Sequence, residues 1–573
     1  MRYKVTDYIA EFLHVQGVDA VFEVVGGMIT HLVDSIYVQG KIRLISVHHE
    51  QAAAFAAEGY ARMTGIPGVA LATSGPGATN LLTGIGSCYF DSVPSIFITG
   101  QVNRFELKGD RPIRQLGFQE TDIIAMVGPI TKQAWRVDRA EDIPQIFADA
   151  VKTALGGRPG PVLIDVPMDV QNTMIECPPP QKVVLAPSAS GDTDLNQLLE
   201  DLNKAQHPLL LVGGGLRSAG AVNEFRSVAE KLNIPVIHSL MGVDVLSNDS
   251  DLRIGMLGSY GNRWVNLAIG MSDFMLVLGS RLDIRQTGAD TKWFGTGRVI
   301  YQVDIDAGEL NNRVTGCETI HAHLKPFLQT LNNHLDSPSP KWNSWLKTIE
   351  ELKAEWPDTR ELGDVEGINP NKLMHHLADY SSAAEAYVVD VGQHQMWAAQ
   401  SLDLIEHQRF LTSGGMGAMG FSLPAAVGAS FAANSEPIVL VAGDGSFQLN
   451  IQELQTVAHH RLPIKLVVLN NQNHGMVRQF QQSYFNERYT STYWGYSSPD
   501  FAKVAQAYGI EAATVTDEAD LDSAFKAMWA DPTAPYLLQV AINPFLNVYP
   551  KIAFGHPITE MEPFVKPKSM EST

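Results

Sequence analysis

The sequence predicts an α/β protein with three domains, each built on a doubly wound parallel sheet. Short apolar runs alternate with amphipathic segments of helical spacing, as in residues 69–80 and 439–446. Several runs lead into Gly or Asp turns, as strands at a ligand-binding sheet edge do. Breaks in composition at 178–194 and 336–340 separate three units. We expect domains at residues 1–180, 190–335 and 365–550, followed by a C-terminal tail or lid at 551–573.

Composition is that of a soluble globular protein. The 573 residues are 45% hydrophobic and 18% charged, enough for three ordinary domains. A formal net charge of -20 argues against a nucleic-acid partner. Three cysteines without a CxxC pair argue against disulfides or a thiolate metal site. The sequence has no signal peptide and no run long enough to span a membrane, so we expect a cytoplasmic protein.

In the first unit, Glu50 follows the apolar stretch Ile42–Val47 and opens an alanine-rich helical segment. A carboxylate in the first turn of a helix is favoured by the helix dipole, so Glu50 alone fits a structural role. A carboxyl group in a cleft could instead transfer protons. The residues by themselves favour the structural role.

The middle unit repeats the pattern of strand and turn. Its apolar runs cover residues 208–215, 274–279 and 299–304, and each leads into a Gly or Asp turn. We therefore expect another parallel sheet here. The glycine triplet at 213–215 is, by itself, weak evidence for a nucleotide site.

The third unit contains the most informative segment, Pro437–Gly475. Its sequence predicts a buried strand at Ile438–Ala442, a helix over Asn450–His459 and a second buried strand at Lys465–Leu469. In a parallel sheet, the loops that follow these two strands open on the same edge. Ligands of α/β sheets gather at that edge.

The two loops carry oxygen ligands that suit a metal ion. The first is the turn Gly443-Asp444-Gly445, and the second begins with Asn470-Asn471. Mg²⁺ prefers such oxygen donors and is usually shared with phosphate groups. The glycines let backbone amides approach those phosphates. The segment therefore predicts a magnesium site that binds a diphosphate.

This segment resembles the signature of thiamine diphosphate enzymes. The resemblance implies Asp444, Asn471 and the carbonyl of Asn473 as Mg²⁺ ligands. It also implies that Glu50 hydrogen-bonds the pyrimidine ring of the cofactor and activates it. The residues that it places near the diphosphate are Gly443, Gly445 and Ser446.

Within these enzymes, the chain resembles the acetohydroxyacid synthase group over nearly its whole length. In the loop at 411–424, Gly417 would offer a carbonyl to the pyrimidine and Met419 would bend the cofactor. Residues 390–400 resemble the diphosphate loop, and residues 117–121 resemble an active-site segment. The implied residues are Gly392, Gln393 and His394 for the cofactor, and Gly27, Phe118 and Gln119, with Glu50, for catalysis.

The middle domain resembles the flavin-binding domain of that group. The segments starting at Gly255 and Gly279 carry this resemblance, which implies FAD. Its role would be structural, because decarboxylation and carbon–carbon ligation need no net redox change. A flavin-free relative is the alternative. The implied FAD residues are Arg158, Gly213, Gly214, Gly215, Arg281 and Asp304.

Departures from the group concern the substrate. Phe480 stands where the group has Trp, Met168 replaces a lysine, and Ile284 replaces an acidic residue. Arg285 is retained and suits an acceptor carboxylate, because a guanidinium binds one in bidentate fashion. The expected substrate residues are Arg285, Met476 and Phe480.

The resulting prediction is a carboligase that decarboxylates pyruvate and transfers its two-carbon unit to a ketone. The C-terminal segment 550–563 and residues 114–120 resemble a branch that acts on nucleotide-linked keto-sugars. The alternatives are an acetolactate synthase, a pyruvate oxidase or decarboxylase, and a non-catalytic relative. The resemblance implies a homodimer or homotetramer that binds small molecules, with a regulatory subunit left open.

Overall fold

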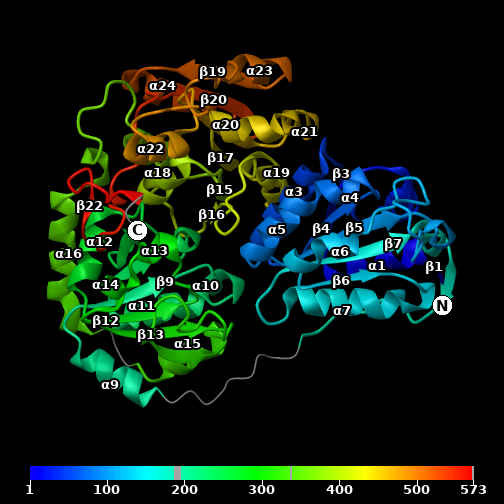
Figure 1. Ribbon diagram of the computed structural model, residues 1–573, viewed down its shortest axis with the longest axis horizontal. Coiled ribbons are helices and arrows are strands. Elements are labelled where there is room, and N and C mark those ends of the chain that lie inside the picture. The colour runs from blue at the N-terminus through cyan, green and yellow to red at the C-terminus, as the bar shows by residue number, and fades with distance from the viewer. Residues whose placement is uncertain (186–194, 336–338, 571–573) are drawn as a thin grey trace.

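The computed structural model describes residues 1–185, 195–335 and 339–570, and has three α/β domains (Figure 1). Each contains a six-stranded sheet with helices on its faces, which confirms the predicted fold class. The predicted breaks at 188–194 and 336–338 lie outside the described residues. No helix in the described ranges is both long and apolar enough to cross a membrane.

The first domain has a fully parallel sheet with strands in the order β3-β2-β4-β5-β7-β6. A short antiparallel pair, β1 with β8, joins its ends. Its elements are β1 (Arg2–Lys4), α1 (Val5–Gln16), β2 (Ala20–Val24), α2 (Thr30–Gln39), β3 (Arg43–Ser46), α3 (Glu50–Thr64), β4 (Gly68–Ala72), α4 (Pro76–Asn80), α5 (Leu82–Phe90), β5 (Ser95–Gln101), α6 (Ile123–Val127), β6 (Gln133–Arg136), α7 (Ile143–Leu155), β7 (Pro161–Pro167), α8 (Met168–Gln171) and β8 (Met174–Glu176).

The central domain has the parallel strand order β11-β10-β9-β12-β13-β14. Its strands include the three predicted apolar runs. Its elements are α9 (Asn196–Lys204), β9 (Pro208–Val212), α10 (Gly215–Ser218), α11 (Val222–Leu232), β10 (Val236–His238), β11 (Arg253–Met256), α12 (Arg263–Met271), β12 (Phe274–Leu278), α13 (Ile284–Thr287), α14 (Thr291–Gly295), β13 (Val299–Asp304), β14 (Glu318–His321), α15 (Leu324–Asn333) and α16 (Asn343–Glu355).

The third domain has the parallel strand order β16-β15-β17-β18-β20-β19. A short antiparallel hairpin, β21 with β22, follows it. The elements are α17 (Pro370–Tyr380), β15 (Ala386–Val389), α18 (Gln393–Ser401), β16 (Arg409–Leu411), α19 (Ser422–Ala432), β17 (Ile438–Gly443), α20 (Asp444–Phe447), α21 (Leu454–His460), β18 (Ile464–Asn470), α22 (Gly475–Tyr484), α23 (Phe501–Ala507), β19 (Glu511–Val515), α24 (Leu521–Met528), β20 (Tyr536–Ala541), β21 (Lys551–Ile552) and β22 (Met561–Glu562).

The strand orders locate the ligand edges. Numbered along the chain, the first and third domains share the order 2-1-3-4-6-5, and the central domain has 3-2-1-4-5-6. In such sheets a ligand binds beside the position where the strand order reverses, because the chain connections from the two neighbouring strands run in opposite directions there. This position lies between β2 and β4 in the first domain, between β9 and β12 in the central domain, and between β15 and β17 in the third domain. Each domain therefore has one predicted ligand crevice.

The helix expected over Asn450–His459 is only partly correct. A 3₁₀ helix covers Gln448–Glu453, and α21 begins only at Leu454. Asn450 has non-helical backbone angles because its side-chain amide donates hydrogen bonds to the carbonyl of Gly420 and to the side chain of Gln51. Local helical spacing was overridden by these contacts with two other segments.

Helices α3 and α19 join the first domain to the third (Figure 1). A Cβ at Gly428 would overlap the carbonyl oxygen of Ala56, and a Cβ at Gly59 would overlap that of Ala425. The helices can therefore approach this closely only because glycine occupies both positions. Their apolar side chains belong to one continuous core that includes strands of both domains.

The C-terminal segment returns from the third domain to the central one (Figure 1). Ile552, Ile558 and Met561 are part of the central domain's buried core. The backbone N–H of Ile552 donates to the carbonyl of Ser259 at 2.9 Å. These contacts hold residues 551–562 against the central domain. A lid role for the segment stays a prediction.

We expect Gly428→Ala to weaken the contact between the first and third domains. The added methyl group has no space against backbone, and overpacking of this kind costs about 1–3 kcal/mol. The midpoint of thermal unfolding should therefore fall. Gly295→Ala is the control, because Gly295 lies in the helix α14 and a Cβ there would come no closer than 3.9 Å to any atom outside that helix. Equal unfolding midpoints for the two variants would contradict the packing argument.

A histidine between two carboxylates ties the linker before the third domain to that domain. His375, on α17, lies 2.6 Å from Asp403 and 3.0 Å from Asp358. Burial opposes the charge on the ring, but the hydrogen bonds and charges of the two carboxylates outweigh it and raise the pKa of His375 to about 10. The ring is therefore positively charged at neutral pH.

This pair of contacts predicts a pH dependence of stability. The pKa of an unfolded histidine is about 6.5, so the stabilisation is complete below that pH and is lost as the pH rises towards 10. The unfolding midpoint of His375→Gln should lie furthest below that of the wild type near pH 6. The difference should vanish near pH 10. His376→Gln, which removes an exposed pair with Asp522 at 3.7 Å, should show no such trend.

Candidate functional site

The carboxyl end of β17 presents a buried carboxylate. Asp444 begins α20 and is 2% exposed, and the hydroxyl of Tyr496 donates to it at 3.1 Å. Burial raises the pKa of Asp444 to about 6, and the hydrogen bond from Tyr496 opposes this only partly. Asp444 forms no ion pair with another described residue. A cation beside it would relieve the cost of this buried charge.

The next strand brings two asparagines to the same edge. Asn471 and Asn473 follow β18, and both are buried. The side-chain amide of Asn471 donates to Gln393 at 3.2 Å, while its oxygen accepts the backbone N–H of Asn473. The side-chain oxygen of Asn473 is buried without a hydrogen-bond partner. The structure thus gathers Asp444, Asn471 and Asn473 at one edge, as their spacing predicts.

The third loop of this edge follows β15. Gly392 precedes α18, whose first residues Gln393 and His394 are buried. Burial lowers the pKa of His394 to about 3, so its ring is neutral, and its Nε2 atom has no hydrogen-bond partner. A Cβ at Gly443 would lie 2.9 Å from His394, so the loops after β15 and β17 touch. The serine hydroxyl of Ser446 donates to the Gly443 carbonyl at 3.1 Å.

This edge fits a magnesium ion that is shared with a ligand. The described residues contain no cluster of three or more His, Cys, Asp or Glu side chains that could hold a metal alone. They do place one carboxylate beside amide oxygens, one of which lacks a partner. Mg²⁺ is bound in this way by one or two protein oxygens with phosphate groups and water. Position 445 needs glycine, because a Cβ there would lie only 2.7 Å from the ring of His474.

The glycine-dense loop between β16 and α19 is held firmly at its end. Asp390, which follows β15, accepts the backbone N–H groups of Gly420 at 3.0 Å and Ser422 at 2.8 Å. Burial raises the pKa of Asp390, and these hydrogen bonds favour its charged form. Gly417 has a φ of 64°, a conformation that glycine adopts without strain. Met419 lies between Gly417 and the anchored end and is partly buried.

The predicted catalytic residues of the first domain gather around the loop after β4. Glu50 begins α3, is 9% exposed and accepts a hydrogen bond from the side chain of Asn80 at 2.8 Å. A Cβ at Gly75, in that loop, would lie 3.0 Å from the Cβ of Gln119. Gly27 precedes Met28, whose backbone N–H donates to the side chain of Thr73 in the same loop at 3.3 Å. The structure brings these three predicted residues together at one crevice.

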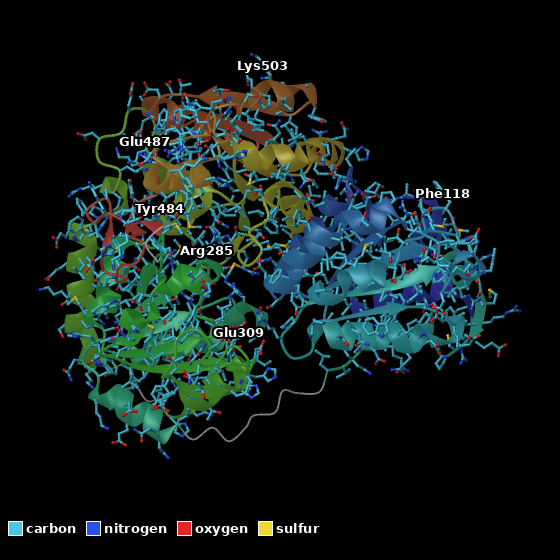
Figure 2. All side chains as sticks on the ribbon, in the orientation of Figure 1. Phe118, Arg285, Glu309, Tyr484, Glu487 and Lys503 are labelled. Carbon is cyan, nitrogen blue, oxygen red and sulfur yellow. The ribbon has the colours of Figure 1, made fainter. Side chains whose placement is uncertain are left out.

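Phe118 and Arg285 are not brought together within one chain. Phe118 is 78% exposed. Figure 2 shows it at the outer side of the first domain, whereas Arg285 lies near the middle of the molecule on the central domain. Arg285 is close in this view to Tyr484, the last residue of α22. The acceptor residues and the catalytic residues of a single chain therefore lie apart.

Helix α22 carries the other two predicted substrate residues. Met476 is partly buried near its start, and Phe480 is 40% exposed one turn further on. The ring of Phe480 lies 4.8 Å from that of Tyr484 and 5.8 Å from that of Phe485. An aromatic surface therefore faces outwards from this helix.

A cavity of about 600 Å³ opens at the crevice of the central domain. It lies at the carboxyl ends of β9, β12 and β13, and the first and third domains complete its wall. A Cβ at Gly213 would overlap the carbonyl oxygen of Gly279, so only glycine allows these two loops to approach. The predicted flavin residues Arg158, Gly213, Gly214, Gly215, Arg281 and Asp304 all line the cavity, as does Arg285.

The cavity fits a dinucleotide. The strand order 3-2-1-4-5-6 is that of dinucleotide-binding sheets, and Asp304 ends β13 at the carboxyl edge where ligands of such sheets bind. Arg158, from the first domain, forms ion pairs with Asp306 at 3.1 Å and Glu309 at 2.8 Å. These pairs close one side of the cavity, so Arg158 is not a free cation.

The sequence did not indicate the residues that form hydrogen bonds with the predicted site residues and with their loops. Asn80 fixes the carboxylate of Glu50, Tyr496 donates to Asp444, and Asp91 accepts the backbone N–H groups of Gly414 and Gly415. Tyr496 and Asp91 lie far along the chain from their partners and belong to no motif. Asn80 ends the segment 69–80, in which a predicted strand leads into a glycine turn, and this position was the only available signal.

Three family models match the chain, one for each domain. The N-terminal thiamine pyrophosphate (TPP) binding domain of the thiamine pyrophosphate enzymes matches residues 3–126. The central domain of these enzymes matches residues 195–331, and their C-terminal TPP binding domain matches residues 390–540. The crevices described above in the first and third domains therefore belong to thiamine diphosphate binding domains.

Curated relatives are similar along nearly the whole chain. The acetolactate synthase isozyme 2 large subunit of Escherichia coli is 38% identical over 97% of this chain and 98% of its own length. The acetolactate synthase large subunit of Lactococcus lactis is 37% identical over 95% and 93%. A chloroplastic acetolactate synthase of Nicotiana tabacum is 38% identical over 96% and 84%. The chain belongs to the acetolactate synthase family of thiamine diphosphate enzymes.

Proposed function

We propose that the protein is an acetolactate synthase that joins two 2-keto acids, with pyruvate as the donor. The observation that carries the proposal is Arg285 in a chain that matches such synthases along 95–97% of its length. Arg285 lines the cavity and is exposed, and its guanidinium has no ion pair with residues 1–185, 195–335 or 339–570. A free guanidinium there suits the carboxylate of a second keto acid.

Each predicted residue has a role in this reaction. When bound, thiamine diphosphate supplies the nucleophilic carbon and the electron sink for decarboxylation. Asp444, Asn471 and Asn473 would hold Mg²⁺ on its diphosphate, close to Gly392, Gln393 and His394. Glu50, fixed by Asn80, would hold and return the proton at the pyrimidine nitrogen.

The remaining residues orient the reactants. Gly417 would accept a hydrogen bond from the pyrimidine, while Met419 would support its bend. FAD would occupy the cavity of about 600 Å³ in a structural role, because the ligation needs no net redox change. Gln119, Arg285 and Phe480 would position the acceptor, so that its carbonyl meets the bound two-carbon unit.

The alternative acceptor is a nucleotide-linked keto-sugar. The departures at Met168, Ile284 and Phe480 favour a larger acceptor, but the curated relatives give this branch no support. Phe480 keeps an aromatic ring where the family pattern has Trp, and Tyr484 and Phe485 adjoin it. This aromatic wall remains compatible with a small keto acid. We therefore favour the synthase over the keto-sugar branch.

We also infer a homodimer as the smallest active form. Phe118 is 78% exposed, which is unusual for an active-site aromatic residue unless another chain covers it. It lies on the outer side of the first domain, away from Arg285 (Figure 2). A second chain could cover Phe118 and supply the missing part of each site. A tetramer of two such dimers is the alternative.

The products formed from pyruvate test the proposal. Purified protein with thiamine diphosphate, Mg²⁺ and FAD should convert labelled pyruvate alone to acetolactate, detected by mass spectrometry, because Arg285 can hold the carboxylate of a second pyruvate. Little acetolactate, with label in an acetyl branch on an added keto-sugar, would overturn the proposal in favour of that acceptor. Free acetaldehyde or acetate as the main product would indicate a decarboxylase or an oxidase.

Glu50→Gln tests the proton transfer. We expect turnover to fall by about 10²–10⁴-fold, because the amide cannot exchange a proton with the pyrimidine. The dissociation constant for thiamine diphosphate, measured by tryptophan fluorescence, should change little, since Gln preserves size and polarity. Glu141→Gln, at an exposed side chain, is the control. Wild-type turnover in Glu50→Gln would refute the assigned role.

A further inference from the structure

Asp91, just after α5, anchors the glycine-dense loop of the third domain. Its carboxylate accepts the backbone N–H groups of Gly414 at 2.9 Å and Gly415 at 2.6 Å. It also pairs with Arg62 at 2.7 Å, and its side chain is only 2% exposed. A carboxylate this buried is costly to leave without partners. The loop therefore starts at a point fixed by the first domain.

The anchored peptide also forms part of the flavin-type cavity. Asp91, Gly414, Gly415 and Met241 all line that cavity. A Cβ at Gly414 would overlap the sulfur atom of Met241, and a Cβ at Gly214 would lie 3.1 Å from the Cβ of Met241. Met241 thus packs between the glycine triplet and the loop. A ligand that fills this cavity would therefore contact the residues that fix the start of the loop.

The loop leads from this anchor to the thiamine diphosphate crevice. Its far end is held by Asp390 through Gly420 and Ser422. Between the two anchors, Met416 is 42% exposed and Gly417 has a left-handed backbone. The position of Gly417 therefore depends on two carboxylates, one in its own domain and one in the first domain.

We propose that Asp91 is a positioning residue that couples the flavin-type cavity to the thiamine diphosphate site. Gly414, Gly415 and Met241 would pack on a bound dinucleotide, which restricts the loop to the arrangement that presents Gly417. By linkage, each ligand then tightens the binding of the other by the same factor. The inference rests on the flavin assignment in the proposed function and not on the acceptor. This coupling would explain why an enzyme that joins two carbon atoms retains a flavin that undergoes no net redox change.

Binding measurements test this without any turnover. Protein stripped of cofactors is titrated with thiamine diphosphate and Mg²⁺, with and without saturating FAD, and followed by isothermal titration calorimetry. FAD should lower the dissociation constant for thiamine diphosphate by about fivefold or more. The reverse titration, followed by flavin fluorescence, should give the same factor for FAD.

Two variants separate coupling from general stability. Asp91→Asn keeps the size of the side chain but replaces one acceptor with a donor that faces a backbone N–H. The coupling should fall below about twofold, while each ligand still binds alone. Glu58→Gln is the matched control, because Glu58 pairs with the same Arg62 at 2.6 Å and, among the described residues, forms no hydrogen bond or ion pair with the loop. It should retain the wild-type coupling.

Each outcome decides the proposal. Wild-type coupling in Asp91→Asn, no coupling in the wild type, or no FAD binding to the wild type would overturn it. If Asp91→Asn does not fold, Met241→Ala is measured instead, and unchanged coupling in that variant would overturn it equally. Coupling in protein that makes no acetolactate would support this inference and refute the proposed acceptor.

Discussion

The contact between α3 and α19 is the constraint on which the rest of the structure depends. Both helices start at ligand edges, α3 with Glu50 and α19 directly after the loop that carries Gly417. Their crossing, which glycine brings to backbone contact, fixes the relative position of those edges. The apolar side chains around the crossing form one core with both sheets. The first and third domains therefore keep separate sheets but share one close-packed core.

Charged groups complete this arrangement where the three domains meet. Arg409 of the third domain pairs with Asp244 of the central domain at 2.8 Å and donates to the carbonyl of Arg62 in the first domain at 2.9 Å. Arg217 pairs with the other oxygen of Asp244 at 3.2 Å. Desolvation offsets much of the attraction in such buried pairs. We interpret them as fixing which surfaces meet, while apolar burial supplies most of the stability.

The sequence allowed the sheets and single-domain sites to be predicted, because both follow local rules. Apolar runs identified β12, β13, β17 and β18 within one residue of their ends, and β9 within three. Asp444 and Asn471 met because parallel strands share an edge. The start of α21 and the anchor at Asp91 depend instead on contacts between distant segments, which periodicity does not encode. The acceptor depended on isolated substitutions and on the two short segments 114–120 and 550–563, and these favoured the keto-sugar over the keto acid.

The return of the C-terminal hairpin has a consequence for how the protein is made. Ile552, Ile558 and Met561 belong to the core of a domain whose sheet is finished by residue 321. During synthesis, the ribosome releases that sheet more than two hundred residues before these three side chains emerge. The nascent central domain therefore carries an uncovered apolar face throughout synthesis of the third domain. Its core is complete only after residue 561 has left the ribosome.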